Sequence, residues 1–119
     1  MKLNKILLFI VFLFANTAHS EIITIEGSHT FTQPSDMDLY RAIDNCLSQA
    51  LINGVYNYLS SDNNYNEEQK IKIMSVLEKA INMIVIDPLI TSQEINNNII
   101  TIRAKANIST TILYHILNN

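Results

Sequence analysis

Residues 100–108 have the sequence ITIRAKANI, the most regular pattern in the chain. Apolar and polar residues alternate along it without exception. Such alternation is typical of a strand in an antiparallel sheet that is buried on one face and solvated on the other. The apolar face carries Ile100, Ile102, Ala104, Ala106 and Ile108, and the polar face carries Thr101, Arg103, Lys105 and Asn107. Because Ala104 and Ala106 are small, the pattern also predicts that a helix approaches this strand closely.

A second extended segment precedes this strand and forms a hairpin with it. Residues 96–98 are three asparagines, which tolerate the positive φ that a tight hairpin turn needs. Before them, from about Asn82, isoleucines alternate at Ile84, Ile86 and Ile90. Pro88 interrupts this run and cannot donate a ladder hydrogen bond, which predicts an edge strand or a strand broken at residues 87–88.

A third strand is predicted over residues 21–31. Ile23, Ile25 and Phe31 share one face with Gly27 and His29, and β-branched residues are frequent. A glycine inside a strand suggests a bulge or a close approach of another backbone. Gln33-Pro34-Ser35 ends the strand.

Two helices are predicted between the first strand and the hairpin. The first covers residues 36–60 and is about 35 Å long at 1.5 Å per residue. Ser35 or Asp36 is expected to cap it, since their side chains accept hydrogen bonds from free backbone N–H groups. Its apolar stripe contains Tyr40, Ile43, Leu47, Ala50, Leu51, Val55 and Tyr58, with Cys46 and Gly54 on or beside it.

A polar loop over residues 61–65 leads to the second helix, where Asn66 and Gln69 form a weak capping pair. The expected stripe of this helix is the stem of Lys70 with Met74, Leu77 and Ile81, adjoined by Ile71 and Ile84. A short last helix follows Ser109 or Thr110, either of which could cap it, and carries Ile112, Leu113, Ile116 and Leu117.

These elements predict an α+β fold in the order β-α-α-β-β-α. A small antiparallel sheet of about three strands, with the long helix and the shorter helices on one face, buries every apolar stripe. Glycine and proline occur only twice each, which disfavours a disordered linker. We expect a single domain over residues 21–119.

Residues 1–20 have the layout of a secretory signal peptide. Lys2 and Lys5 precede an apolar run over residues 6–15, and Ala18-His19-Ser20 provides small residues for a cut between Ser20 and Glu21. Ten apolar residues are too few for a membrane span, which needs about twenty. A lipid anchor would need a cysteine in place of Glu21. The sequence therefore predicts a periplasmic or secreted protein, with the uncleaved anchor as the alternative.

Cleavage would leave an acidic domain. The basic residues fall from 8 to 6 because Lys2 and Lys5 are removed, all 11 acidic residues remain, and the net charge becomes −5. An acidic domain is a poor electrostatic match for nucleic acid or for anionic lipid. Membrane association is therefore expected only through a partner.

The reactive residue types form no recognisable catalytic or metal-binding pattern, and we predict no enzyme activity and no cofactor. His29 and His115 are far apart in sequence, and neither has another histidine or a cysteine near it in sequence. Cys46 lies at a stripe edge without a CxxC motif, which favours a buried, inert thiol over a disulfide-linked dimer. The paired acids 36/38 and 67/68 are explained by helix starts.

The tyrosines are the best candidates for a binding role. Tyr40 and Tyr58 are expected to pack in or beside the core. Tyr56 and Tyr65 lie near the far end of the long helix and are the predicted partner contacts, because aromatic side chains give contact area at a low cost in entropy.

Three segments resemble the N-terminal domain of flagellar assembly protein T and related small outer-membrane lipoproteins. They are Ile23-Thr24-Ile25-Glu26-Gly27, the helical AIDNCLSQAL (42–51) leading into GVYNYLSS (54–61), and TIRAKANI (101–108). The resemblance covers most of residues 21–108. It implies a long helix packed on a small sheet and a partner in a flagellar or outer-membrane assembly. Unlike the lipoproteins, this sequence has Glu21 where the lipid-bearing cysteine would be.

The leading hypothesis is a non-enzymatic periplasmic or secreted protein-binding module that docks through an exposed sheet edge and the long helix. The alternative is a secreted inhibitor or effector that binds a partner enzyme. A small hydrolase with an unfamiliar site is a third hypothesis. The sequence leaves the partner and the oligomeric state open.

Overall fold

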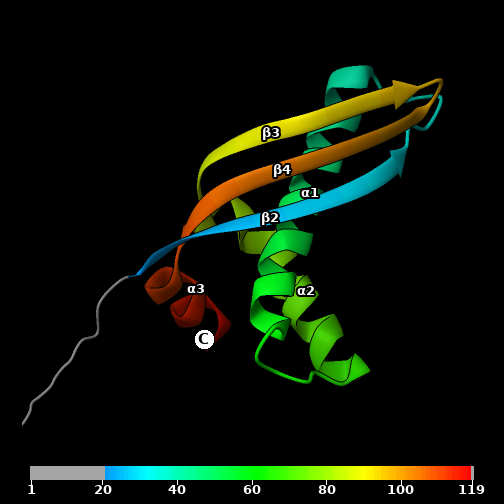
Figure 1. Ribbon diagram of the computed structural model, residues 1–119. Helices are drawn as coiled ribbons and strands as arrows, with labels where there is room; N and C mark the ends of the chain where they lie inside the picture. The colour runs from blue at the N-terminus through cyan, green and yellow to red at the C-terminus, as the bar shows by residue number, and fades with distance from the viewer. Residues whose placement is uncertain (1–20, 119) are drawn as a thin grey trace, which may run out of the picture.

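The computed structural model describes residues 21–118, and the predicted signal peptide lies outside them. The strands are β2 (Ile22–Thr32), β3 (Val85–Asn96) and β4 (Ile99–Ser109). The helices are α1 (Leu39–Ser60), α2 (Glu67–Ile84) and α3 (Thr110–Leu117). This α+β fold has the predicted order, β-α-α-β-β-α. Helices α1 and α2 lie behind the three-stranded sheet in Figure 1, and α3 lies at the end where β2 begins.

The sheet is antiparallel and has the order β2-β4-β3, with β4 in the middle. The alternation predicted for residues 100–108 is confirmed, because Ile100, Ile102, Ala104 and Ile108 are completely buried. Strand β2 pairs with β4 in one unbroken register that places Gly27 opposite Ala104. Residue 27 therefore makes no bulge, and of the two predicted alternatives the close approach of another backbone is correct.

Strand β3 is an edge strand with an irregular register, as its proline predicted. The pairing with β4 shifts between Ile86 and Leu89 and again between Ile90 and Ser92. Asp87, just before Pro88, has a positive φ of 52°, and Asn97 in the hairpin turn has a φ of 58°. The strand begins at Val85, three residues after the predicted start, because α2 continues to Ile84.

Helix α1 begins later than predicted, and its cap is neither Ser35 nor Asp36. The Asp38 side chain accepts a hydrogen bond from the Arg41 backbone N–H at 2.9 Å. Ahead of it, the Met37 N–H donates to the Pro34 carbonyl oxygen at 3.1 Å. This turn holds residues 34–37 outside the helix, so Asp38 is the first side chain able to cap it.

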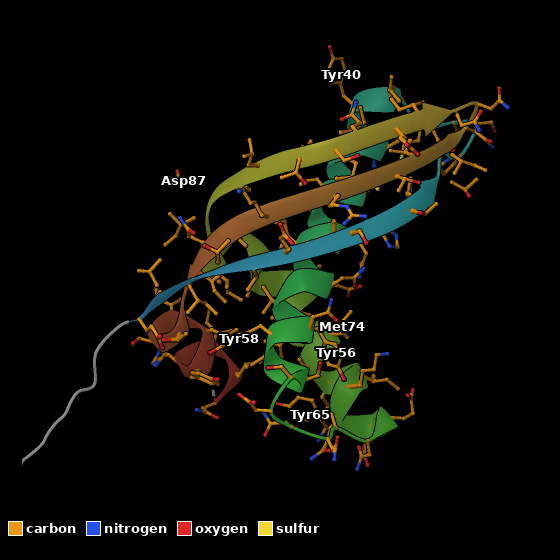
Figure 2. All side chains as sticks on the ribbon, in the orientation of Figure 1. Tyr40, Tyr56, Tyr58, Tyr65, Met74 and Asp87 are labelled. Atoms are coloured by element: carbon orange, nitrogen blue, oxygen red, sulfur yellow. The ribbon has the colours of Figure 1, made fainter. Side chains whose placement is uncertain are left out.

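The face of α1 that meets the sheet is a row of small residues four apart: Ala42, Cys46, Ala50 and Gly54. All of them are buried. The prediction that Tyr40 packs in or beside the core is wrong, since 87% of its surface is exposed. Tyr40 precedes Ala42 by two residues, and each residue of a helix turns by about 100°, so the Tyr40 side chain lies about 200° around the helix from the row that faces the sheet. Figure 2 shows it pointing away from the fold at the start of α1.

The small residues let α1 touch the sheet with its backbone. A Cβ atom added to Gly27 would lie against the Ala50 carbonyl oxygen and 2.5 Å from the Gly54 nitrogen. Such contacts are shorter than real Cβ atoms make, so only glycine fits at residue 27. Helix α1 therefore crosses the sheet directly beneath β2.

Helix α2 is capped as predicted, by a reciprocal pair in which Asn66 and Gln69 each bond the backbone of the other. Its buried face holds Leu77, Ala80, Ile81 and Ile84. Ile71, predicted to adjoin this face, is instead 65% exposed. The first two turns of α2 extend beyond the sheet (Figure 1), and Lys70 is exposed there too.

Helix α3 follows β4 without a loop. Of the two predicted caps, Ser109 is the one that accepts from the Ile112 N–H, at 3.3 Å. The Thr110 backbone N–H and hydroxyl both donate to the Glu21 carbonyl oxygen, at 2.9 and 3.2 Å. These bonds tie the start of α3 to the residue that precedes β2.

Candidate functional site

The end of the α1–α2 pair projects past the sheet. Gly54 is the residue of α1 beneath β2, and the helix continues for six more residues to Ser60. The loop before α2 and the first turns of α2 complete this end of the molecule (Figure 1). We call it the helical tip, residues 55–76.

The helical tip brings together the two predicted partner contacts. The ring centroids of Tyr56 on α1 and Tyr65 in the loop are 6.1 Å apart, with the ring planes tilted by 44° (Figure 2). This spacing is typical of a stabilising aromatic pair. The Lys70 ammonium nitrogen lies 5.5 Å from the Tyr56 ring centroid, within the range of a cation–π contact. Both rings are half-buried, so each keeps part of its surface open.

Tyr65 also lines a groove of about 770 Å³ between the helical tip and α3. Two apolar side chains remain open to solvent in it: Ile71 is 65% exposed and Tyr114 is 45% exposed. The complete lining is Asn63, Tyr65, Ile71, Lys72, Ile73, Ser75, Val76, Tyr114, Leu117 and Asn118. A mainly apolar lining with a few polar groups is the usual character of a binding site.

A hydrogen bond between two tyrosines holds α3 beside α1. Tyr58 is half-buried at the boundary of the core, as predicted, and its hydroxyl is hydrogen-bonded to that of Tyr114. The Tyr58 hydroxyl donates this hydrogen bond to the Tyr114 oxygen, and together with burial the bond raises the pKa of Tyr58 to about 12. The bond links Tyr114, which lines the groove, to helix α1.

The sequence indicated one side of this site and missed the other. Tyr56 and Tyr65 stood out because they are aromatic residues near a loop. Ile71 was expected to adjoin the buried stripe of α2, and Tyr114 was assigned no role. Their closeness depends on the packing of α3 against α2, two helices separated in sequence by a hairpin, and no local pattern encodes that contact.

Cys46 is fully buried, as predicted for an inert thiol. Its Sγ donates to the His29 carbonyl oxygen at 3.2 Å and lies 3.6 Å from the Ile100 carbonyl oxygen. Burial raises the pKa of the Cys46 thiol, so little reactive thiolate forms at neutral pH. The role of Cys46 is to fill the narrow space between α1 and the sheet.

The histidines and several of the carboxylates lie on different elements. Half-burial lowers the pKa of His29 on β2, and His115 lies on α3. Asp38 caps α1, and Glu67 and Glu68 occupy the first turn of α2. Within the described residues, no three His, Cys, Asp or Glu side chains are close enough to share a metal ion. The residues that line the groove include no histidine, cysteine or carboxylate.

Between residues 21 and 118, no helix has the length and the apolar character needed to cross a membrane. In comparisons with known proteins, no family model, no curated protein and no solved structure matches the chain.

Proposed function

We propose that this protein is a non-enzymatic protein-binding module and that the groove between the helical tip and α3 receives its partner. The observation that carries the proposal is the exposure of Ile71 and Tyr114 in one groove of about 770 Å³. Exposed apolar side chains gathered in a concave site are typical of contact surfaces.

The lining also supports contact rather than catalysis. General acid–base and nucleophilic catalysis need a positioned histidine, thiol, carboxylate or activated hydroxyl. The groove instead offers tyrosine rings and aliphatic side chains, with Lys72, Asn63, Ser75 and Asn118 as polar groups, and no histidine or carboxylate lines it to activate the Ser75 hydroxyl. Tyrosine and aliphatic anchors surrounded by polar groups are the usual composition of a protein interface.

The proposed setting is the cell envelope or the exterior. It rests on the signal-like residues 1–20, and the resemblance to flagellar assembly protein T makes a flagellar or outer-membrane assembly the proposed class of partner. A partner enzyme, as in the inhibitor alternative, would use the same groove and would be identified by the same experiment.

Site-specific photocrosslinking of the full chain in its native host tests the proposal. A photoreactive amino acid replaces Ile71 in one variant and Met83 in the other. Both residues are on α2 and equally open, at 65% and 67% exposure, but only Ile71 lines the groove. We expect one defined protein adduct from position 71 and none from position 83.

Two results would contradict the proposal. Equal adducts from both positions would mean that the groove is not the contact surface. No protein adduct from either position, with both variants folded and exported, would mean that the protein does not act through this surface. Mass spectrometry of the adduct separates an envelope component from an enzyme partner.

A further inference from the structure

The sheet has two free edges, and they are not equivalent. Strand β3 is obstructed in the ways that commonly prevent edge pairing: Pro88, a positive φ at Asp87, and two register shifts. Strand β2 has none of these features. It runs for eleven residues in unbroken register with β4, without proline and with Glu26 as its only charged side chain. Such an edge can accept another strand.

The backbone of β2 shows which of its groups are available. The Gln33 N–H donates to Asn98 at 2.7 Å, and the Glu21 carbonyl accepts from Thr110 at 2.9 Å. Odd-numbered residues of β2 therefore direct their N–H and C=O groups toward β4. Successive residues of a strand alternate in direction, so the even-numbered residues direct theirs outward. These are Ile22, Thr24, Glu26, Ser28, Thr30 and Thr32.

One of these outward groups already has a partner. The Asn53 side-chain amide of α1 donates to the Ser28 carbonyl oxygen at 2.9 Å. Asn57, one turn later, lines a small hollow together with Glu26, Gly27 and Ser28 of β2 and Arg103 of β4. No other outward backbone group of β2 has a hydrogen-bond partner among residues 21–118. The edge is thus bordered by α1 but remains unpaired along most of its length.

The position of α1 discriminates between two possible occupants. Gly27 is the middle residue of β2 and the point where α1 crosses beneath it. If two copies paired along the whole of β2, Gly27 would oppose Gly27 and both copies of α1 would need the same space. A single extended segment brings no helix with it. It needs only a small side chain where it passes over α1.

We propose that the outer edge of β2 binds an extended peptide segment of a partner protein, which pairs as a fourth strand with a glycine or alanine opposite Gly27. The inference rests on the proposed binding function and adds a second contact, distinct from the groove. Main-chain hydrogen bonds to the even-numbered residues provide the affinity, and alternate side chains of the segment provide the specificity.

The probe for this site is a phage-displayed library of random 12-residue peptides, selected on the full chain. Amide hydrogen exchange by NMR then locates the selected peptides. In the free protein, the amides of Thr24, Glu26 and Thr30 should exchange fast and those of Ile25, Gly27 and His29 slowly. A bound fourth strand should protect the first three and leave the others unchanged.

A matched pair of proline variants provides an independent readout. Thr30→Pro removes an outward N–H from β2. Gln93→Pro removes one from β3, because Gln93 lies opposite Ile102, whose backbone groups face β2. Neither change removes a ladder bond within the sheet. We expect Thr30→Pro to weaken peptide binding by about tenfold or more, through a lost hydrogen bond and steric obstruction, and Gln93→Pro to change it by less than about twofold.

Three results would overturn the inference. If no peptide is selected, β2 is not an acceptor edge. If the peptides protect or shift Ile71 and Tyr114 but no amide of β2, the groove is the sole site and the proposed binding function still stands. If the even-numbered amides become protected on concentrating the protein without peptide, the occupant is a second copy. If the photoreactive residue at position 71 gives no protein adduct in the crosslinking experiment, the proposed function itself is contradicted.

Discussion

Gly27 of β2 and Gly54 of α1 lie backbone against backbone. A Cβ atom on Gly27 would be 2.5 Å from the Gly54 nitrogen, and one on Gly54 would be 2.9 Å from the Glu26 carbonyl oxygen. This contact sets the distance between the long helix and the sheet. It also brings Asn53 within hydrogen-bond reach of the outer edge of β2.

The variant Gly27→Ala should be strongly destabilising. The added methyl group would meet backbone atoms, which cannot move without shifting α1, and overpacking of this kind costs about 1–3 kcal/mol. Urea unfolding followed by circular dichroism measures the loss. Ser28→Ala, next to it on the open face, is the control and should differ little from the wild type. Equal stability of the two variants would show that α1 does not lie this close to β2.

The N-cap of α1 can be tested with two neighbouring aspartates. Asp38→Ala removes the acceptor for the Arg41 N–H and should lower the free energy of unfolding by about 1 kcal/mol. Asp36 lies outside the helix, so Asp36→Ala should leave the free energy of unfolding almost unchanged. The sequence favoured residue 35 or 36 as the cap, so the reverse result would restore that assignment. Both variants can be compared by chemical unfolding at pH 7.

Cys46 should resist thiol reagents in the folded protein. It is fully buried, and its raised pKa keeps the thiol protonated at neutral pH. We expect Ellman's reagent to react only at the rate at which the protein opens, and immediately in denaturant. Non-reducing electrophoresis should show no disulfide-linked dimer. Rapid modification of the native protein would contradict the position of Cys46 between α1 and the sheet.

Because of Tyr58, the free energy of unfolding should depend on pH in the alkaline range. Its pKa is about 12 in the folded protein against 10.0 ordinarily, so the unfolded chain releases the proton first. Between pH 10 and 12 the unfolded state therefore binds fewer protons, and the free energy of unfolding falls as the pH rises.

Tyr58→Phe separates this effect from other titrations. The variant lacks the bond to Tyr114 and should be less stable by about 0.5–1.5 kcal/mol at pH 8. Its stability should then decline less steeply than that of the wild type from pH 10 to 11.5, in urea titrations at each pH. Tyr40→Phe, at a residue that is 87% exposed, is the control and should follow the wild type. Parallel wild-type and Tyr58→Phe profiles would rule out a hydrogen-bonded Tyr58.

Most of the fold could be predicted because its patterns are local. The alternation in residues 100–108, the asparagine turn and the capping pair Asn66 and Gln69 each depend on neighbours in sequence, and each is confirmed. The proline in β3 likewise predicted an irregular edge.

The sequence-based predictions were wrong or incomplete where contacts between residues distant in sequence determine which side chains are buried. Tyr40 belongs to an apolar stripe by spacing, but the small residues from Ala42 to Gly54 determine which face of α1 meets the sheet. Ile71 has the spacing of a core residue, but its part of α2 extends beyond the sheet. The two walls of the groove come from segments about forty residues apart, and the sequence identified only the wall that contains Tyr65.

The strand order has a consequence for how the chain can fold. Strand β2 is the first element described, yet it pairs only with β4, so its partners for Ile22–Thr32 are Ser109–Ile99. In a chain that ends before β4, helices α1 and α2 and the β3 segment are present, but β2 has no strand to pair with. Closing so long a loop is slow compared with forming local helices and hairpins. We therefore expect the sheet to be completed in the last step of folding, and a chain truncated before residue 99 to remain unfolded.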